Sequence, residues 1–154
     1  MIEDTMKGKF LTFSLDQEHY GIDILYVTEI VGLQPVTDVP EMPNFIRGVI
    51  NLRGSIIPVM DARIKFGKEE IEYNDRTCTV VVEVGQVQIG IIVDAVSEVL
   101  TIDDENIVPP PLVGGSGRKY IKNIGKYDNQ IILIVDCEAL LNEDELGSIQ
   151  GINI

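Results

Sequence analysis

His19 is the only histidine among the 154 residues and the side chain best suited to acid–base chemistry near neutral pH. As a general base or metal ligand it would need partners, but no neighbouring His or Cys supplies metal-ligand spacing. The two cysteines, Cys78 and Cys137, do not form a C-x-x-C pair, and each adjoins an apolar run. We therefore expect a surface histidine on an edge strand, two free buried thiols, no metal and no cofactor.

Two other stretches resemble chemical motifs. Gly114, Gly115, Ser116 and Gly117 precede Arg118 and Lys119, but a phosphate-binding loop lies before a helix, whereas a β-strand is expected here, which favours a mobile loop. The acidic run 103–105 lacks the alternating oxygen ligands and the central glycine of a calcium loop. With no nucleophile–base pair in view, the sequence predicts a protein that is not an enzyme.

Composition narrows the class of partner. Hydrophobic residues make up 45% of the chain, as in ordinary globular proteins, and 12 Lys and Arg face 25 Asp and Glu, for a net charge of −13. Such a surface repels phosphate backbones and anionic lipid, which argues against nucleic acid and membrane-surface binding. No apolar run approaches the roughly 20 residues that span a bilayer, so we expect a cytoplasmic protein without membrane insertion.

The chain repeats itself. YGIDILYVTEIV, from Tyr20, aligns without a gap with IGIIVDAVSEVL, from Ile89, a shift of 69 residues. FIRGVINLRGSIIPVMD, from Phe45, aligns with YIKNIGKYDNQIILIVD, from Tyr120, a shift of 75 residues. Two ungapped blocks in the same order indicate a tandem duplication, with repeats at 10–67 and 78–146 inside one domain that spans 1–154.

Each repeat contains five segments with the alternation of a β-strand. They lie near 10–15, 19–24, 27–33, 46–52 and 55–60, and near 78–84, 87–93, 96–102, 120–127 and 131–135. Five short strands joined by tight turns close most easily as a barrel, so we predict an all-β fold of two pseudo-symmetric five-stranded barrels. Asp61 is expected to cap a short helical turn, and Asp136 a C-terminal helix through CEALLNEDEL.

Apolar residues recur at the same spacing in both repeats, in segments that suit short helical turns or bent strands. The first set is Ile24, Val27 and Ile30, and the second is Val93, Val96 and Val99. All six could be core, or they could line a groove where the two lobes meet. An apolar groove of this kind suits an amphipathic helix of a partner.

The repeats differ at one turn. The first repeat has Gly48, Arg53 and Gly54 where the second has Asn123, Asp128 and Asn129. Arg53 is either a flexible surface cation or the partner of Glu29, in which case it would hold the turn against the first lobe.

FLTFSLDQEHYGIDILYVTEI, PNFIRGVINLRGSIIPVMDAR, VGQVQIGIIVDAVSEVL and IILIVD together resemble the CheW family of chemotaxis adaptors, from about Phe10 to Leu146. The resemblance implies two intertwined five-stranded barrels of SH3-like form. It also implies two partners, the coiled-coil cytoplasmic tip of chemoreceptors and the regulatory domain of the histidine kinase CheA. Asn123 stands where many members have a glycine, so the second turn is expected to differ locally.

The resemblance also assigns residues. A receptor-binding groove falls on Leu11, Ile24, Val27, Glu29, Ile30, Val96 and Val99, and a kinase-coupling region falls on Gly48, Arg53 and Gly54. The implied function is a non-enzymatic adaptor in chemotaxis, cytoplasmic and recruited to receptor arrays at the membrane. The alternative is a stand-alone kinase-docking domain derived from a CheA- or CheV-type protein.

Overall fold

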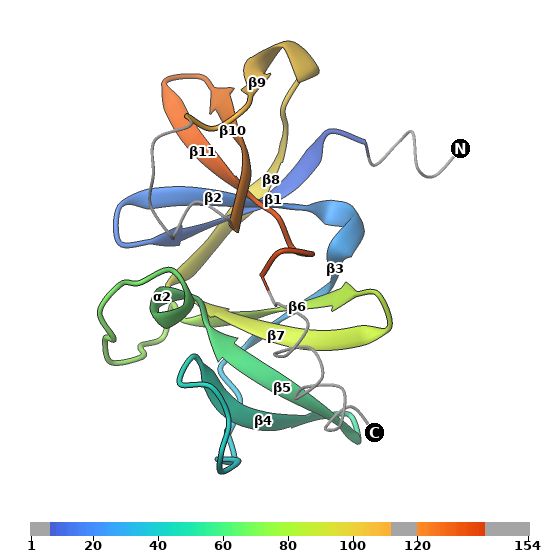
Figure 1. The fold of residues 1–154 in the computed structure, drawn as a ribbon, viewed down its shortest axis with the longest axis vertical. Helices are drawn as coiled ribbons and strands as arrows, with labels where there is room; N and C mark the ends of the chain where they lie inside the picture. Colours follow the sequence, from blue (N-terminus) through green and yellow to red (C-terminus); the bar gives the residue numbers. More distant parts are fainter. Residues whose placement is uncertain (1–6, 112–119, 141–154) are drawn as a thin grey trace.

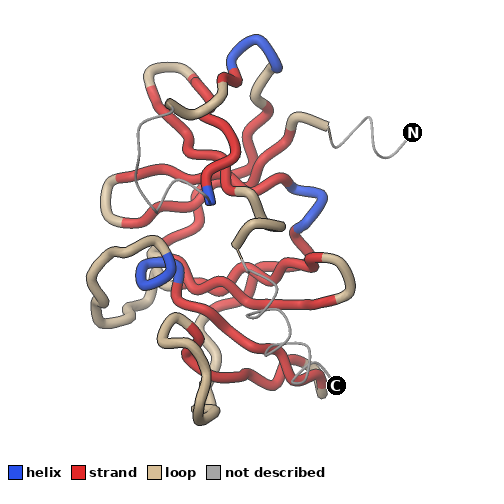
Figure 2. Tube along the Cα trace, in the orientation of Figure 1, coloured by secondary structure: helices blue, strands red, loops and turns tan. Residues whose placement is uncertain are grey.

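The computed structural model describes residues 7–111 and 120–140, and these residues form eleven strands and three short helical turns (Figures 1 and 2). The elements in order are β1 (Lys9–Leu15), β2 (Glu18–Asp23), η1 (Ile24–Tyr26), β3 (Val27–Gly32), β4 (Ile46–Leu52), β5 (Ser55–Asp61), α2 (Ala62–Lys65), β6 (Cys78–Val84), β7 (Val87–Val93), β8 (Ala95–Thr101), η2 (Asp104–Asn106), β9 (Ile107–Val108), β10 (Ile121–Tyr127) and β11 (Gln130–Val135). All ten predicted strands are present. Only the two-residue strand β9 was not predicted, because it is too short to show alternation.

The strands form two sheets that exchange segments between the repeats. The upper lobe of Figure 1 has the order β8-β1-β2-β11-β10-β9, and the lower lobe has β3-β6-β7-β5-β4. Each lobe therefore combines strands of both repeats. The intertwined all-β fold that the sequence predicted is confirmed.

The pairing repeats as closely as the sequence does. In the upper lobe Gly21 on β2 lies opposite Ile134 on the parallel strand β11. The equivalent residues, Gly90 on β7 and Val59 on β5, lie opposite each other in the lower lobe. Because both repeat shifts, 69 and 75 residues, hold within one pair of neighbours, the duplication extends from sequence to strand register.

In the lower lobe the two outer strands of the sheet approach each other. Val31 on β3 packs against a cluster that contains Ile50 of β4, although these strands lie at opposite ends of the sheet order. Glu29 of β3 forms an ion pair with Arg53 of the β4–β5 turn. This curling of the sheet agrees with the predicted barrel form.

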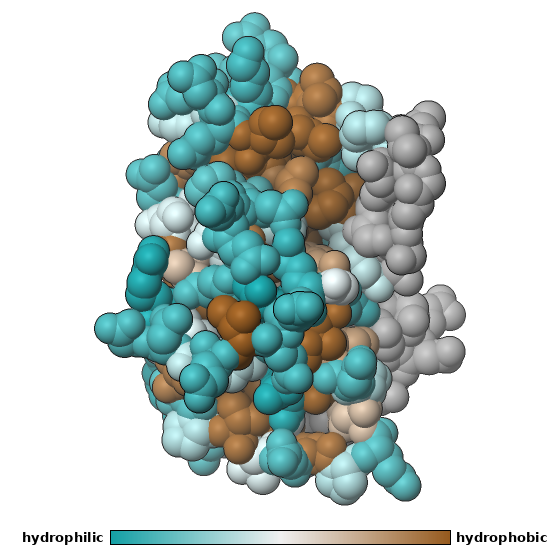
Figure 3. Space-filling view, turned by 90° about the vertical axis from the view of Figure 1, so that its left-hand side faces the viewer, coloured by the Kyte–Doolittle hydropathy of each residue, from teal (hydrophilic) through white to brown (hydrophobic). Residues whose placement is uncertain are grey.

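The face that carries α2 is turned to the viewer in Figure 3. Hydrophilic residues fill most of its middle band, with apolar patches above and below. Polar side chains therefore cover the junction between the lobes on this side.

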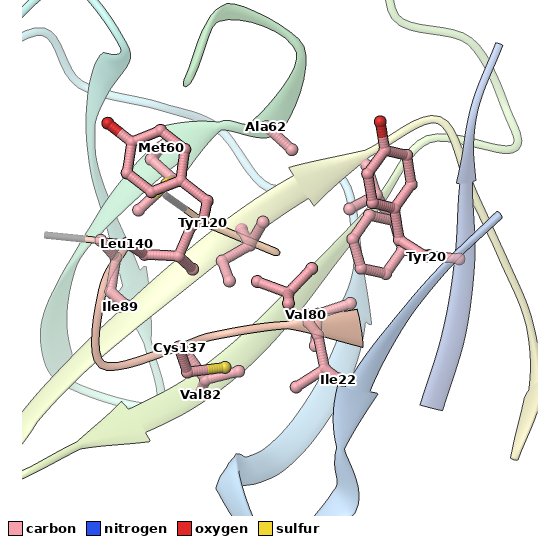
Figure 4. Packing of buried hydrophobic residues seen from close by; sticks show 14 of the residues in the cluster. Tyr20, Ile22, Met60, Ala62, Val80, Val82, Ile89, Tyr120, Cys137 and Leu140 are labelled. Carbon is pink, nitrogen blue, oxygen red and sulfur yellow. The ribbon is translucent and has the colours of Figure 1, made fainter. Parts of the chain in front are cut away.

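Three apolar clusters hold the fold together. One lies within the upper lobe and is formed by Phe10, Leu100, Ile102, Ile132 and Ile134. Another lies within the lower lobe and is formed by Ile50, Ile57, Val59, Val81 and Ile92. The third, the central cluster, joins strands of both lobes and includes the residues labelled in Figure 4: Tyr20, Ile22, Met60, Ala62, Val80, Val82, Ile89, Tyr120, Cys137 and Leu140. Burial of this shared surface unites the two lobes into one domain.

The predicted aspartate caps are both formed. The carboxylate of Asp61 accepts hydrogen bonds from the backbone N–H of Arg63 at 2.8 Å and of Ile64 at 3.3 Å. That of Asp136 accepts from Glu138 at 3.1 Å and Ala139 at 3.2 Å. Residues 137–140 make only a turn, and the rest of the predicted C-terminal helix, 141–146, lies outside the described residues, as does the glycine loop 114–117.

The prediction for His19 was wrong in part. His19 lies on β2, between β1 and β11, and is half-buried rather than on an exposed edge strand. The error arose because the sequence does not show which strand from the other repeat pairs with β2. Cys78 and Cys137 are free thiols, as expected, and of the two Cys137 is fully buried and Cys78 half-buried. In residues 7–111 and 120–140, no helix is long and apolar enough to cross a membrane.

Candidate partner-binding surface

Equivalent bulges shape the two strands that meet at the proposed groove. The register of β3 shifts between Val27 and Glu29, and that of β8 shifts between Val96 and Val99. A bulge places an extra residue in one strand, so side chains three positions apart can point to the same face. This explains why the apolar residues recur at a spacing of three, a period that an ideal strand does not show.

Six apolar residues of the predicted groove come together from both lobes. Ile24, Val27 and Val96 are half-buried and pack against the central cluster, which contains Leu11 at 2% exposure. Ile30 and Val99, at equivalent positions on β3 and β8, remain 43% and 49% exposed. We call Leu11, Ile24, Val27, Ile30, Val96 and Val99 the apolar seam.

The strand pairing shows how the seam reaches the surface. Val99 lies opposite Leu11, and Ile30 lies opposite Val80. Opposed residues on antiparallel strands project to the same face, so Ile30 and Val99 extend the central cluster to solvent. The hypothesis that all six recurring apolar residues are core is wrong for these two, whereas Val93 is fully buried.

Glu29 lies on β3 between Val27 and Ile30 and pairs with Arg53, as one of the two sequence alternatives proposed. Arg53 Nη1 donates to Glu29 Oε1 at 2.7 Å, and Nη2 pairs with Oε2, which gives a two-pronged contact. The guanidinium lowers the pKa of Glu29 below its ordinary value, chiefly through this hydrogen bond. The pair therefore ties the β4–β5 turn to the edge of the seam.

Gly48 and Gly54 support the same turn for different reasons. At Gly48, with φ 144°, a Cβ atom would lie 2.1 Å from the carbonyl oxygen of Thr37. That close approach arises because Thr37 and Val49 exchange two backbone hydrogen bonds of 2.9 Å. Gly54 has φ 89°, a left-handed conformation that follows Arg53 at φ 51°, so the turn itself favours glycine.

The polar groups at the bulges are satisfied within the protein. The Thr12 hydroxyl donates to the carbonyl oxygen of Glu98 at 2.7 Å and accepts from its N–H at 3.2 Å. Thr28 donates to the carbonyl of Val81 at 3.1 Å. These contacts keep the bulges fixed, and so they keep the seam residues in place.

Chemistry at buried titratable groups is disfavoured. Burial raises the pKa of Cys137 to about 12, so its thiol stays protonated and unreactive near neutral pH. Burial likewise raises the pKa of Tyr20, and the neighbouring Glu18 adds to that shift. Within the described part of the chain, no three His, Cys, Asp or Glu residues are grouped as metal ligands.

Sequence reasoning missed a buried charge. Arg63 on α2 is 5% exposed and pairs with Asp16 and Asp94. The repeat carried a signal, since Arg63 aligns with Glu138, a reversal of charge at equivalent positions. It was not followed because a single charged residue after a strand is usually a solvated one.

Residues 9–145 match the model of the CheW-like domain. The chain belongs to the CheW family. It is 39% identical over 150 residues to the chemotaxis protein CheW of Klebsiella aerogenes, covering 97% of this chain and 90% of that protein. It is 33% identical over 138 residues to a probable chemotaxis protein CheW of Rhizobium etli, covering 89% of each.

The CheW fold itself is matched in three dimensions. The crystal structure of the scaffolding protein TtCheW from Thermoanaerobacter tengcongensis superposes with a TM-score of 0.83 at 39% identity, covering 90% of this chain and 94% of that one. The intertwined lobes described above are therefore those of a CheW protein.

Proposed function

We propose that this chain is a non-enzymatic adaptor that couples the cytoplasmic tip of bacterial chemoreceptors to the histidine kinase CheA. The observation that carries the proposal is the apolar seam, to which both lobes contribute an exposed aliphatic residue, Ile30 and Val99. Two such residues over a buried apolar floor suit the apolar face of an amphipathic helix, which is the form that a coiled-coil receptor tip presents.

The Klebsiella relative, matched over 90% of its own length, is named a chemotaxis protein, and the matched crystal structure is that of a scaffolding protein. Both names support an adaptor over a kinase-docking domain of CheA or CheV type. An adaptor works by binding alone: it holds receptor and kinase in one complex, so that the receptor conformation shifts the active population of the kinase.

The kinase-coupling role is proposed for Gly48, Arg53 and Gly54. Arg53 is 70% exposed while its partner Glu29 sits on β3 beside the seam. The turn therefore offers a surface to a second partner and contacts the strand that the first partner would use. This placement would allow one binding event to influence the other.

The test reconstitutes chemoreceptor membranes with CheA and measures both co-sedimentation and autophosphorylation, with and without this protein. Ile30→Lys and Val99→Lys each place a charge in the seam at an exposed site, so both variants should fold. Ile71→Lys is the matched control, because Ile71 is also 43% exposed but lies outside the seam.

The wild-type protein and Ile71→Lys should bring CheA to the membranes and change its activity, and the two seam variants should lose receptor binding by at least about tenfold. Arg53→Ala should keep receptor binding and weaken kinase control. If all variants bind the receptor equally well, the seam is not the receptor site. If the wild-type protein recruits no kinase to matched membranes, the adaptor function itself is wrong.

A further inference from the structure

Arg63 is a buried cation with three hydrogen-bond acceptors. Its Nη1 lies 2.8 Å from Asp16 Oδ1 and 2.6 Å from Asp94 Oδ2, and its Nε donates to the carbonyl oxygen of Glu69 at 2.7 Å. The arginine side chain is only 6% exposed, whereas that of Asp94 is 20% and that of Asp16 is 54% exposed. A guanidinium serves this arrangement because its donors have fixed directions.

The partners of Arg63 belong to different parts of the fold. Arg63 lies on α2, which follows β5 in the lower lobe, whereas Asp16 is in the β1–β2 turn of the upper lobe. Asp94 lies between β7 and β8, where the chain crosses from the lower to the upper lobe. Asp94 Oδ2 also accepts the N–H of Asp16 at 2.8 Å. One side chain thus joins α2, the opposite lobe and the crossover.

The residues after Arg63 add to this junction. The ring of Phe66 stacks on Tyr20 of the upper lobe, with centroids 5.3 Å apart, and lies 5.9 Å from the ring of Tyr120. Lys68 pairs with Glu18 of the β1–β2 hairpin. We call Arg63, Phe66 and Lys68, with their partners Asp16, Glu18, Tyr20 and Asp94, the inter-lobe clamp. It lies on the side of the molecule that carries α2 and the hairpin tip (Figure 1).

The clamp is present at only one of two equivalent places. The residue that corresponds to Arg63 is Glu138, which is exposed and has the opposite charge. The other chain crossing runs through η1, where the carboxylate of Asp23 accepts only a local hydrogen bond, from Leu25 N–H at 3.0 Å. The apolar central cluster supplies binding area between the lobes but little direction, whereas the charged contacts of Arg63 are directional.

We propose that Arg63 is a positioning residue that fixes the angle between the lobes and thereby the spacing of Ile30 and Val99 across the apolar seam. Val96 and Val99 follow Asp94 on β8, so the clamp holds the start of the strand that carries them. The effect on the seam rests on the proposed function, whereas the angle between the lobes can be measured without a partner.

The experiment measures amide residual dipolar couplings of the full chain and fits an alignment tensor to each lobe separately. The wild-type lobes should share one tensor. In Arg63→Met the two tensors should differ in magnitude or orientation, because the lobes reorient once the clamp is open. Arg47→Met is the matched control, since the Arg47–Glu70 pair lies within the lower half of the molecule and does not join the lobes. Asp16→Asn, at the exposed end of the clamp, is a milder second variant should Arg63→Met not fold.

The same proteins are then titrated with a soluble fragment of the coiled-coil receptor tip. Arg63→Met should bind about tenfold more weakly than wild type, with Arg47→Met unchanged and Arg63→Lys intermediate, in the range usual for coupled sites. A folded Arg63→Met or Asp16→Asn protein whose lobes still share the wild-type tensor overturns the proposal. Altered tensors with unchanged tip binding overturn the link to the seam. If the wild-type protein does not bind the tip, the proposed function fails, and the couplings still decide the role of Arg63.

Discussion

The segments that follow β5 and β11 occupy equivalent places in the fold and begin alike. The N–H of Asp61 donates to the carbonyl of Phe45, and that of Asp136 to the carbonyl of Tyr120, each at 2.8 Å. Both aspartates then cap the next turn. Two residues further along, the segments diverge: Arg63 is buried against two carboxylates, while Glu138 is exposed.

The next divergence lies two more residues along. Lys65 places its ammonium 3.9 Å from the ring centroid of Phe45 and 4.8 Å from that of Tyr120, whereas the equivalent Leu140 is buried in the central cluster. Residues kept in both repeats thus build the scaffold, and residues that differ connect one lobe to the other. The differences, rather than the similarities, are where this protein should be tested.

The largest expected effect is on stability when Arg63 is replaced. Arg63→Met leaves two carboxylates without their buried cation, and we expect a loss of about 2–4 kcal/mol in the free energy of unfolding. Glu138→Met, at the equivalent exposed position, should change it by less than about 0.5 kcal/mol. Urea unfolding with matched m-values measures both. Equal effects at the two positions would show that burial of Arg63 contributes nothing that the exposed Glu138 lacks.

A second contrast concerns Gly48 and Asn123. Gly48→Ala should cost about 2–3 kcal/mol, because the new methyl group meets the Thr37 carbonyl and the backbone has φ 144°. Asn123 takes the equivalent position, and Asn123→Ala should cost less than about 1 kcal/mol. Thermal unfolding of the two variants gives the comparison. A Gly48→Ala protein as stable as the wild type would mean that the segment around Thr37 moves freely away from β4.

These contrasts also show what could be predicted from the sequence. The strands, the duplication and the Asp61 and Asp136 caps were predictable, because alternation and capping are local patterns. The pairing of β2 with β11, and hence the place of His19, was not, since strand order across two repeats depends on long-range packing.

The candidate site divides in the same way. The resemblance placed Val27 and Ile30 at the groove, but the sequence could not show that Leu11 is its buried floor and Val99 its exposed border. It also missed the clamp, because the contact of Arg63 with Asp94 joins residues 31 positions apart in sequence.

A smaller effect is expected on the pH dependence of stability. Arg63 lowers the pKa of Asp16, mainly through its hydrogen bond, so Asp16 stabilises the folded state at pH values above its ordinary pKa of 3.8. That contribution is lost as the pH falls through the lowered folded-state pKa. Asp16→Asn should therefore reduce the melting temperature near neutral pH and flatten its decline between about pH 6 and about pH 3.

Asp128→Asn is the control for this titration. Asp128 also occupies a hairpin turn of the upper lobe, with φ 53° against 57° for Asp16, but its turn is not part of the clamp. Its melting curve should keep the wild-type shape. A decline that flattens equally in both variants would assign the effect to the turn conformation rather than to Arg63.

The smallest effect on stability is expected at the β4–β5 turn. Arg53 is 70% exposed and Glu29 28% exposed, so Arg53→Ala should leave the unfolding midpoint unchanged within error. Its effect should appear in kinase coupling, because the ion pair orients the turn against β3. The exchange of both residues, Glu29→Arg with Arg53→Glu, should restore part of the coupling that each single change removes, and autophosphorylation in receptor membranes measures it.

The equivalent turn of the second repeat makes this result specific. There Asp128 stands in place of Arg53, and Glu98 in place of Glu29, so two acidic residues cannot form the pair. Asp128→Ala should therefore alter neither stability nor coupling. If Asp128→Ala impairs coupling as strongly as Arg53→Ala, both turns would serve the kinase alike, and the difference in charge between the repeats would not distinguish their functions.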